Sequence, residues 1–116
     1  MENFKIIQKL ESTRSRLLKE EIILNEMKNK NDVFFKGMTL AYNKLLTFGV
    51  KQVPESKSNG DGLEWYEFSK LIESLVSRKL TGHAARDQIL EKMEKSDVNE
   101  WNFFYKRILQ KDMRCG

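Results

Sequence analysis

The stretch Ser77-Arg78-Lys79-Leu80-Thr81-Gly82-His83-Ala84-Ala85-Arg86-Asp87 decides how this chain folds, because it places a basic helix end, a glycine and a new helix start within eleven residues. Apolar residues recur at three- and four-residue spacing just before it, which predicts an amphipathic helix that closes at the two cations. Gly82 allows the backbone to turn sharply, and Thr81 can cap the helix that follows. The sequence therefore predicts two helices joined by a tight corner.

This corner is also a candidate site for a phosphate. The first amide groups of a helix point outward at the positive end of its dipole, so an anion beside nearby cations is stabilised. Most glycine corners between helices bind nothing, however, and a pair of cations at a helix end is usually solvated. The residues that we expect to contact a phosphate here are Arg78, Lys79, Thr81, Gly82, His83 and Arg86.

The rest of the chain also predicts helices, since one proline and six glycines are few for 116 residues rich in Leu, Lys, Glu and Met. Residues 50–61 contain turn residues without a period and are expected to form a loop. The expected helices cover residues 4–10, a segment capped by Ser12 or Thr13, a segment from Asn31 or Asp32 to Gly49, residues 63–79, residues 82–95, and a last segment that begins at Ser96 or Asp97. The fold class is therefore all-α, a compact bundle of five to seven short helices.

Helical spacing also assigns the apolar and aromatic side chains to the core rather than to base stacking. Asp97 and Glu100 have the spacing of a capping box, in which each side chain bonds the backbone of the other. The residues expected to face the core include Leu17, Leu18, Ile22, Ile23, Phe34, Phe35, Tyr42, Phe68, Trp101 and Phe104.

Composition indicates one intracellular domain spanning residues 1–116. A hydrophobic content of 40% is enough for one compact core. The first residues show no leader, and no apolar run approaches the roughly 20 residues that cross a bilayer, so we expect a cytoplasmic protein without a membrane partner. The single cysteine, Cys115, excludes an internal disulfide and agrees with a reducing compartment.

Charge is distributed unevenly along the chain, whose net charge is +4. Residues 1–50 carry 9 basic and 6 acidic groups, residues 51–76 carry 3 and 5, and residues 77–116 carry 9 and 6. Basic ends around an acidic segment suit a polyanion, although many helical proteins show as much. Cations early in the second helix oppose its dipole, a cost that neighbouring phosphates would offset. Further expected phosphate contacts near the C-terminus are Lys106, Arg107, Lys111 and Arg114.

Three patterns resemble enzymatic or metal sites, but each lacks a feature that such a site requires. Lys57-Ser58-Asn59-Gly60 resembles the adenylated lysine string of nucleotidyltransferases, yet an isolated loop lacks the closed pocket that activates a lysine. Residues 57–68 resemble the end of a calcium loop, but its first position is a lysine and its twelfth is Phe68. One cysteine and one histidine cannot build a zinc site.

The string Arg78-Lys79-Leu80-Thr81-Gly82-x-Ala84-Ala85 recurs in a known family. With Asp97-Val98, Arg107, Asp112 and Cys115-Gly116 downstream, it resembles the N-terminal DNA-binding domain of ATP-dependent DNA ligases from T-even-like bacteriophages. The resemblance covers nearly the whole chain. Its specific part is the downstream half, whereas the middle loop diverges in length and composition.

The resemblance implies a non-catalytic module, the N-terminal part of a longer ligase that acts in DNA replication and repair. Such a domain binds nicked duplex DNA from the minor-groove side, through phosphates and without reading sequence. ATP and Mg²⁺ would belong to catalytic domains absent from this chain, which itself needs no cofactor. A sliding clamp is implied as a further partner, and a monomer is expected. The alternative is a small helical protein-interaction module whose acidic segment, residues 51–76, meets a basic partner.

Overall fold

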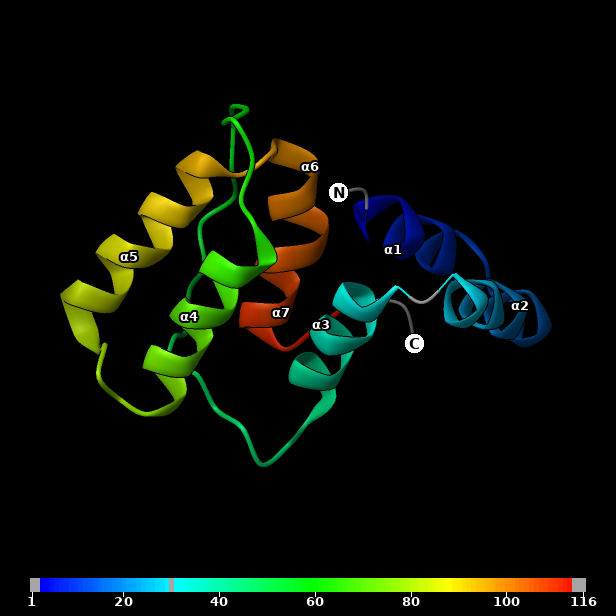
Figure 1. The fold of residues 1–116 in the computed structure, drawn as a ribbon, viewed down its shortest axis with the longest axis horizontal. Coiled ribbons are helices and arrows are strands. Elements are labelled where there is room, and N and C mark those ends of the chain that lie inside the picture. The colour runs from blue at the N-terminus through cyan, green and yellow to red at the C-terminus, as the bar shows by residue number, and fades with distance from the viewer. Residues whose placement is uncertain (1–2, 30, 114–116) are drawn as a thin grey trace.

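The computed structural model describes residues 3–29 and 31–113, and all regular structure within them is helical (Figure 1). The helices α6, η1 and α7 follow one another without a break, and η1 is a π-helical turn. The all-α bundle of short helices that the sequence predicts is therefore confirmed. The elements are α1 (Asn3–Ser12), α2 (Arg16–Lys28), α3 (Asp32–Tyr42), α4 (Trp65–Val76), α5 (Gly82–Lys95), α6 (Val98–Glu100), η1 (Trp101–Tyr105) and α7 (Lys106–Gln110).

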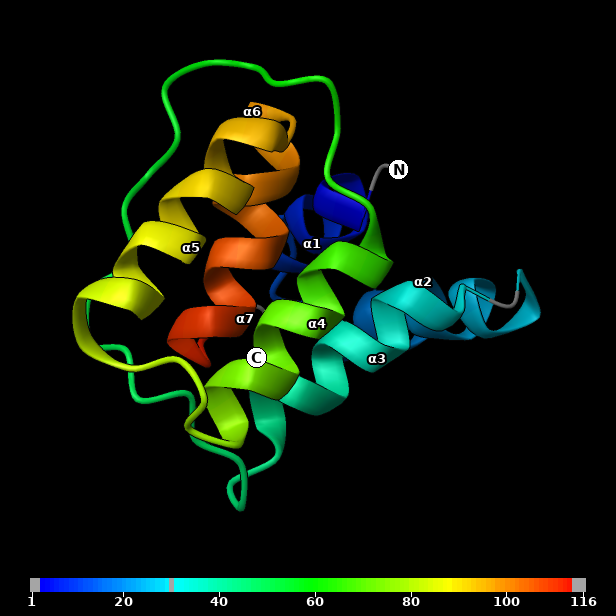
Figure 2. The same cartoon turned by 60° about the vertical axis from the view of Figure 1, so that its left-hand side comes forward.

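The continuous rod of α6, η1 and α7 forms the centre of the bundle. It contacts α1 and α3, whereas α4 packs on α5 and α2 on α1. Figures 1 and 2 show α5 and α2 at opposite ends of the molecule, whose longest dimension is 43 Å. Among the described helices, none combines the length and the apolar character needed to cross a bilayer.

Four of the ten residues predicted to face the core are fully buried, as the helical spacing predicts: Phe34, Phe68, Trp101 and Phe104. Gly37 lets α3 approach the central rod closely, because a Cβ atom there would lie 2.6 Å from the Phe104 ring. The rings around Phe68 pack at tilted angles of 44° to 56°, with ring centroids 4.5 to 5.7 Å apart.

The third helix is shorter than predicted, because α3 ends at Tyr42 and not at Gly49. The ammonium group of Lys111 donates to the carbonyl oxygens of Leu40 (2.7 Å) and Asn43 (2.8 Å), which satisfies the end of the helix from a distant element. Beyond it the chain leaves in an extended conformation. Tyr42 is consequently 50% exposed, so its assignment to the core is wrong. Phe35 is only partly buried.

The second helix departs most from the prediction. Its N-cap is Ser15, whose hydroxyl accepts the Leu18 amide at 3.3 Å, and not Ser12 or Thr13. None of the described residues of α2 is buried, and Leu17 is 77% exposed, because this helix packs on α1 at the edge of the bundle. Of the predicted apolar stripe, only Ile22 and Ile23 contact the core.

Around the glycine corner the prediction is largely correct. The helix α5 covers residues 82–95 as expected, and Gly82 adopts the left-handed φ of +57°. The preceding helix is shorter than predicted because Arg78 has a φ of +64°, which no α-helix accommodates.

A long non-helical connection, residues 43–64, is held by η1 and not by regular structure of its own. The side-chain amide of Asn102 accepts the Ser56 N–H (2.7 Å) and donates to the Ser56 carbonyl (3.0 Å). The Trp101 indole donates to the Pro54 carbonyl and the Tyr105 hydroxyl to the Leu63 carbonyl. The first two residues of the π-turn and its last residue therefore hold the connection against the bundle.

The tip of this connection also closes the C-terminal end of α5. The N–H groups of Gly60 and Gly62 donate to the carbonyl oxygens of Ser96 (2.9 Å) and Lys95 (2.7 Å). A Cβ atom at Gly60 would lie within 2.5 Å of the backbone of Lys95, so glycine is required there.

The predicted capping box is half correct. The carboxylate of Asp97 accepts the amides of Asn99 and Glu100, both at 3.0 Å, as an N-cap. Glu100 does not return the bond. Its carboxyl instead accepts the Phe4 N–H at 2.6 Å, so it caps the start of α1, which packs against α6 and η1. Glu100 is only 4% exposed, and this burial raises its pKa to about 7.

Glu100 should therefore make the protein less stable as the pH rises. Because its folded-state pKa lies above the ordinary value of 4.5, the stabilisation is complete below pH 4.5 and is lost as the pH passes through about 7. We expect the free energy of unfolding to fall by about 1–3 kcal/mol between pH 5 and pH 8. Urea unfolding across this range measures the change. Glu100→Gln, which keeps an acceptor for Phe4 but cannot ionise, should flatten the profile, and parallel profiles for the two proteins would contradict the assignment.

Candidate nucleic-acid interface

An open cleft of about 950 Å³ lies between the first turns of α5 and residues 49–54 of the long connection. The predicted site residues Gly82, His83 and Arg86 line it from the helix side. Its apolar floor includes Val53 and Ile89, both buried. The lining residues include no carboxylate, so the cleft offers cations and backbone groups to an anion.

The start of α5 opens into this cleft without a side-chain cap. Thr81 occupies the N-cap position, but its hydroxyl makes no capping hydrogen bond, which corrects the predicted role of this residue. The first turn of the helix carries no acidic residue either. Side chains of Ser15, Asn31 and Asp97 cap the starts of α2, α3 and α6, whereas α4 and α5 both begin without one. The first amides of α5 are therefore unoccupied donors at the positive end of a 14-residue helix.

Gly82 leaves space at this position. Its φ of +57° disfavours any side chain, yet a Cβ atom built there would meet no atom within 4 Å. The cleft is therefore open at the point where the chain turns into the helix.

Arg78, the first residue of the predicted corner, serves the structure of the corner. Its guanidinium donates to the Thr47 hydroxyl (2.6 Å) and to the Leu75 carbonyl (3.3 Å), and it lies against the backbone of Gly49. It thus joins the end of α4 to the segment that forms the far wall of the cleft. Lys79 is exposed and does not line the cleft.

The predicted C-terminal cations do not gather on one surface. Arg107 is 6% exposed and bonds Glu11 at 3.1 and 3.3 Å, so it is buried in an ion pair between α7 and α1. Lys111 caps α3, and partial desolvation lowers its pKa. Lys106 is half-buried beside a smaller hollow of about 340 Å³ that Glu55 also lines. Arg114 lies outside the described residues.

The far wall of the cleft holds residues that sequence reasoning did not single out. Lys51 is exposed and faces the start of α5 across the cleft, together with Gln52. Lys51 belongs to the net acidic segment 51–76, so segment charge gave no reason to select it. In the sequence, Gly49 is a local signal that the connection turns there, and in the structure it has a left-handed φ of +70°.

The patterns that resemble enzymatic or metal sites lie on the long connection or lack grouped ligands. Lys57 is exposed on the long connection, and Asn59 of the same string accepts the Val98 N–H at 2.8 Å. In the described part of the chain, no three His, Cys, Asp or Glu side chains are grouped to hold a metal ion.

Because Arg78 and Lys79 differ in their contacts, their removal should differ in its effect on stability. Arg78→Ala deletes one hydrogen bond to Thr47 of the connection and one to the Leu75 carbonyl of α4, and should lower the free energy of unfolding by about 1 kcal/mol. Lys79→Ala removes an exposed side chain and should change it by less than about 0.5 kcal/mol. Thermal and urea unfolding of the two variants tests this, and equal losses would show that the Arg78 contacts contribute nothing.

Comparison with known proteins relates the whole chain to part of a ligase. Solved structures named "Pmar-Lig_Pre." and "Pmar-Lig_PreS3", both ligases, match 100% of this chain with a TM-score of 0.97 and with 48% and 49% identity. The chain spans only 27% of the length of each. No family profile and no curated protein matches the sequence. The chain is therefore similar, over its full length, to about a quarter of a ligase.

Proposed function

We propose that this domain binds the phosphate backbone of nicked duplex DNA, without sequence preference, as the N-terminal module of an ATP-dependent DNA ligase of the T-even bacteriophage type. The observation that carries the proposal is the uncapped start of α5, which opens into a cleft lined by Lys51, His83 and Arg86. The similarity to a quarter of two ligase chains supports the same conclusion.

The chemistry of the cleft suits a phosphate and not a base edge. Outward amides, a helix dipole and flexible cations recognise negative charge, and they carry no information about sequence. The cleft contributes few groups that could pair with a base, apart from Gln52. Contact through phosphates fits a protein that must act at a nick in any sequence.

Catalysis would belong to the rest of the ligase. In this proposal the adenylated lysine, ATP and Mg²⁺ are supplied by other domains, and residues 1–116 contribute retention on DNA. A sliding clamp remains a proposed further partner, and the described residues offer no reason to place its contact on one surface.

A second candidate function is a protein-interaction module. The exposed apolar side chains of α2 favour it, because apolar residues exposed together often mark a protein contact. These side chains are Leu17, Leu18, Leu24 and Met27. The two functions differ in the salt dependence of duplex binding, which is steep for phosphate contacts and absent for a domain that binds only proteins.

Gly82 provides the sharpest test of the cleft. Gly82→Val should weaken duplex binding, since its side chain would project into the open space beside the first amides of α5. Gly62→Val is the matched control, because Gly62 also has a positive φ (+132°) and no atom within 4 Å, but lies outside the cleft. Both variants should lose about 1–2 kcal/mol of stability from backbone strain, and only Gly82→Val should lose affinity for DNA.

The measurement is fluorescence anisotropy with a nicked 30-base-pair duplex at several salt concentrations, below the melting temperature of each variant. Lys51→Gln and Arg86→Gln should each flatten the plot of log affinity against log salt by about 0.9. If Gly82→Val binds as tightly as Gly62→Val, the cleft is not a phosphate site. If the parent protein shows no salt-dependent binding, the DNA-binding function itself is wrong.

A further inference from the structure

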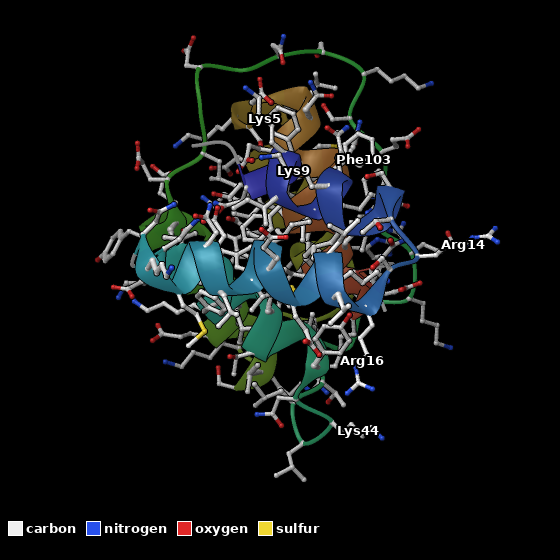
Figure 3. All side chains as sticks on the ribbon, turned by 90° about the vertical axis from the view of Figure 1, so that its right-hand side faces the viewer. Lys5, Lys9, Arg14, Arg16, Lys44 and Phe103 are labelled. Atoms are coloured by element: carbon white, nitrogen blue, oxygen red, sulfur yellow. The ribbon has the colours of Figure 1, made fainter. Side chains whose placement is uncertain are left out.

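We propose that the face formed by α1, the start of α2 and the segment after α3 is a second phosphate-binding surface for duplex DNA, separate from the α5 cleft. Figure 3 shows its cations around the N-terminal end of α2. We call this set the α2 arc, and its members are Lys9, Arg14, Arg16 and Lys44. The inference rests on the proposed function and adds a contact region to it.

The cations of the α2 arc are exposed and largely free of partners. Within the described residues, no hydrogen bond or ion pair engages the side chains of Lys9, Arg14 or Lys44. Arg16 pairs only with Glu20, at 3.2 Å on a surface where the Arg16 side chain is 93% exposed. Such an exposed pair is weak and exchanges easily for a phosphate.

The carboxylate that lies closest to the arc in the chain is already engaged. Glu11, between Lys9 and Arg14, bonds the buried Arg107 through both of its oxygens. The Glu11 carboxylate therefore balances the charge of the buried Arg107 and does not pair with the exposed cations of the arc. The surface charge here is less balanced than the sequence of residues 9–16 suggests.

The position of the arc costs stability in the absence of an anion. Arg14 and Arg16 lie at the positive end of the α2 dipole, and the first turn of α2 has no acidic residue to compensate. Phosphates beside this end would relieve the repulsion. A structural role does not explain the arrangement, because these cations make none of the helix-capping bonds that Arg78 and Lys111 make.

The α2 arc and the α5 cleft cannot share one phosphate. Figures 1 and 2 show α2 and α5 at opposite ends of the molecule, with the segment after α3 between them. Contacts at the two surfaces should therefore contribute independently to binding. An acidic protein could also meet these cations, but the arc follows three separate elements around a helix end, which suits the spaced charges of a nucleic-acid backbone.

The test compares two double variants of equal charge. Lys9→Gln with Arg14→Gln removes two arc cations, and Lys57→Gln with Lys70→Gln removes two exposed cations outside both surfaces. Affinity for the nicked 30-base-pair duplex is measured against salt, and melting temperatures confirm that both variants fold. We expect the arc variant to flatten the log–log slope by about 1.8 relative to the parent, and the control to leave it nearly unchanged.

Combination with a cleft variant separates the two proposals. Adding Arg86→Gln to the arc variant should flatten the slope by about a further 0.9. If the parent binds DNA and Arg86→Gln weakens it, but the arc variant matches its control, the arc proposal is wrong while the cleft remains. If the parent shows no salt-dependent binding, both fail. If the arc variant loses affinity and the cleft variants do not, the arc is supported and the cleft is overturned.

Discussion

The long connection between α3 and α4 sets the main constraint on this domain. A non-helical segment of this length carries many backbone groups that need partners, and such segments are uncommon in small domains. Here the partners come from one region, the π-turn and the ends of α5 and α6. Trp101, Asn102 and Tyr105 of η1 all bond this connection. Because residues 49–54 form one wall of the α5 cleft and Trp101 bonds Pro54, these bonds help to hold that wall in place.

The cations of the protein divide into two groups, those that bond other residues of the fold and those that are exposed to solvent. Arg107 pairs with a carboxylate, and Arg78 and Lys111 donate hydrogen bonds to backbone carbonyl groups within the fold. Their removal would leave these polar groups unsatisfied. Lys51 and Arg86, like the α2 arc, face solvent. A net charge of +4 therefore understates how unevenly positive charge is exposed. The proposed DNA contacts draw on the second group on two separate surfaces of the molecule.

Local chemistry explains what the sequence predicted well. The bounds of α5, the sharp turn at Gly82 and the Asp97 cap all depend on residues a few positions apart. The errors have distant causes. Lys111 ends α3 early from the far end of the chain, and Glu100 caps α1 instead of its own helix. The cleft was half predicted for the same reason, since the wall containing Lys51 is held by distant residues, through the bonds of Pro54 to Trp101 and of Thr47 to Arg78.

The two ends of α5 are held differently. Its last turn is fixed by Gly60 and Gly62, and Lys95 pairs with Glu67 of α4 at 2.7 Å. Its first turn buries Ala85 but has no side-chain cap and borders an open cleft. Local opening should therefore begin at residues 82–84 and require less free energy than opening at residues 92–96. An anion that occupies the first amides would complete the attachment, so binding in the cleft would also rigidify the helix that forms it.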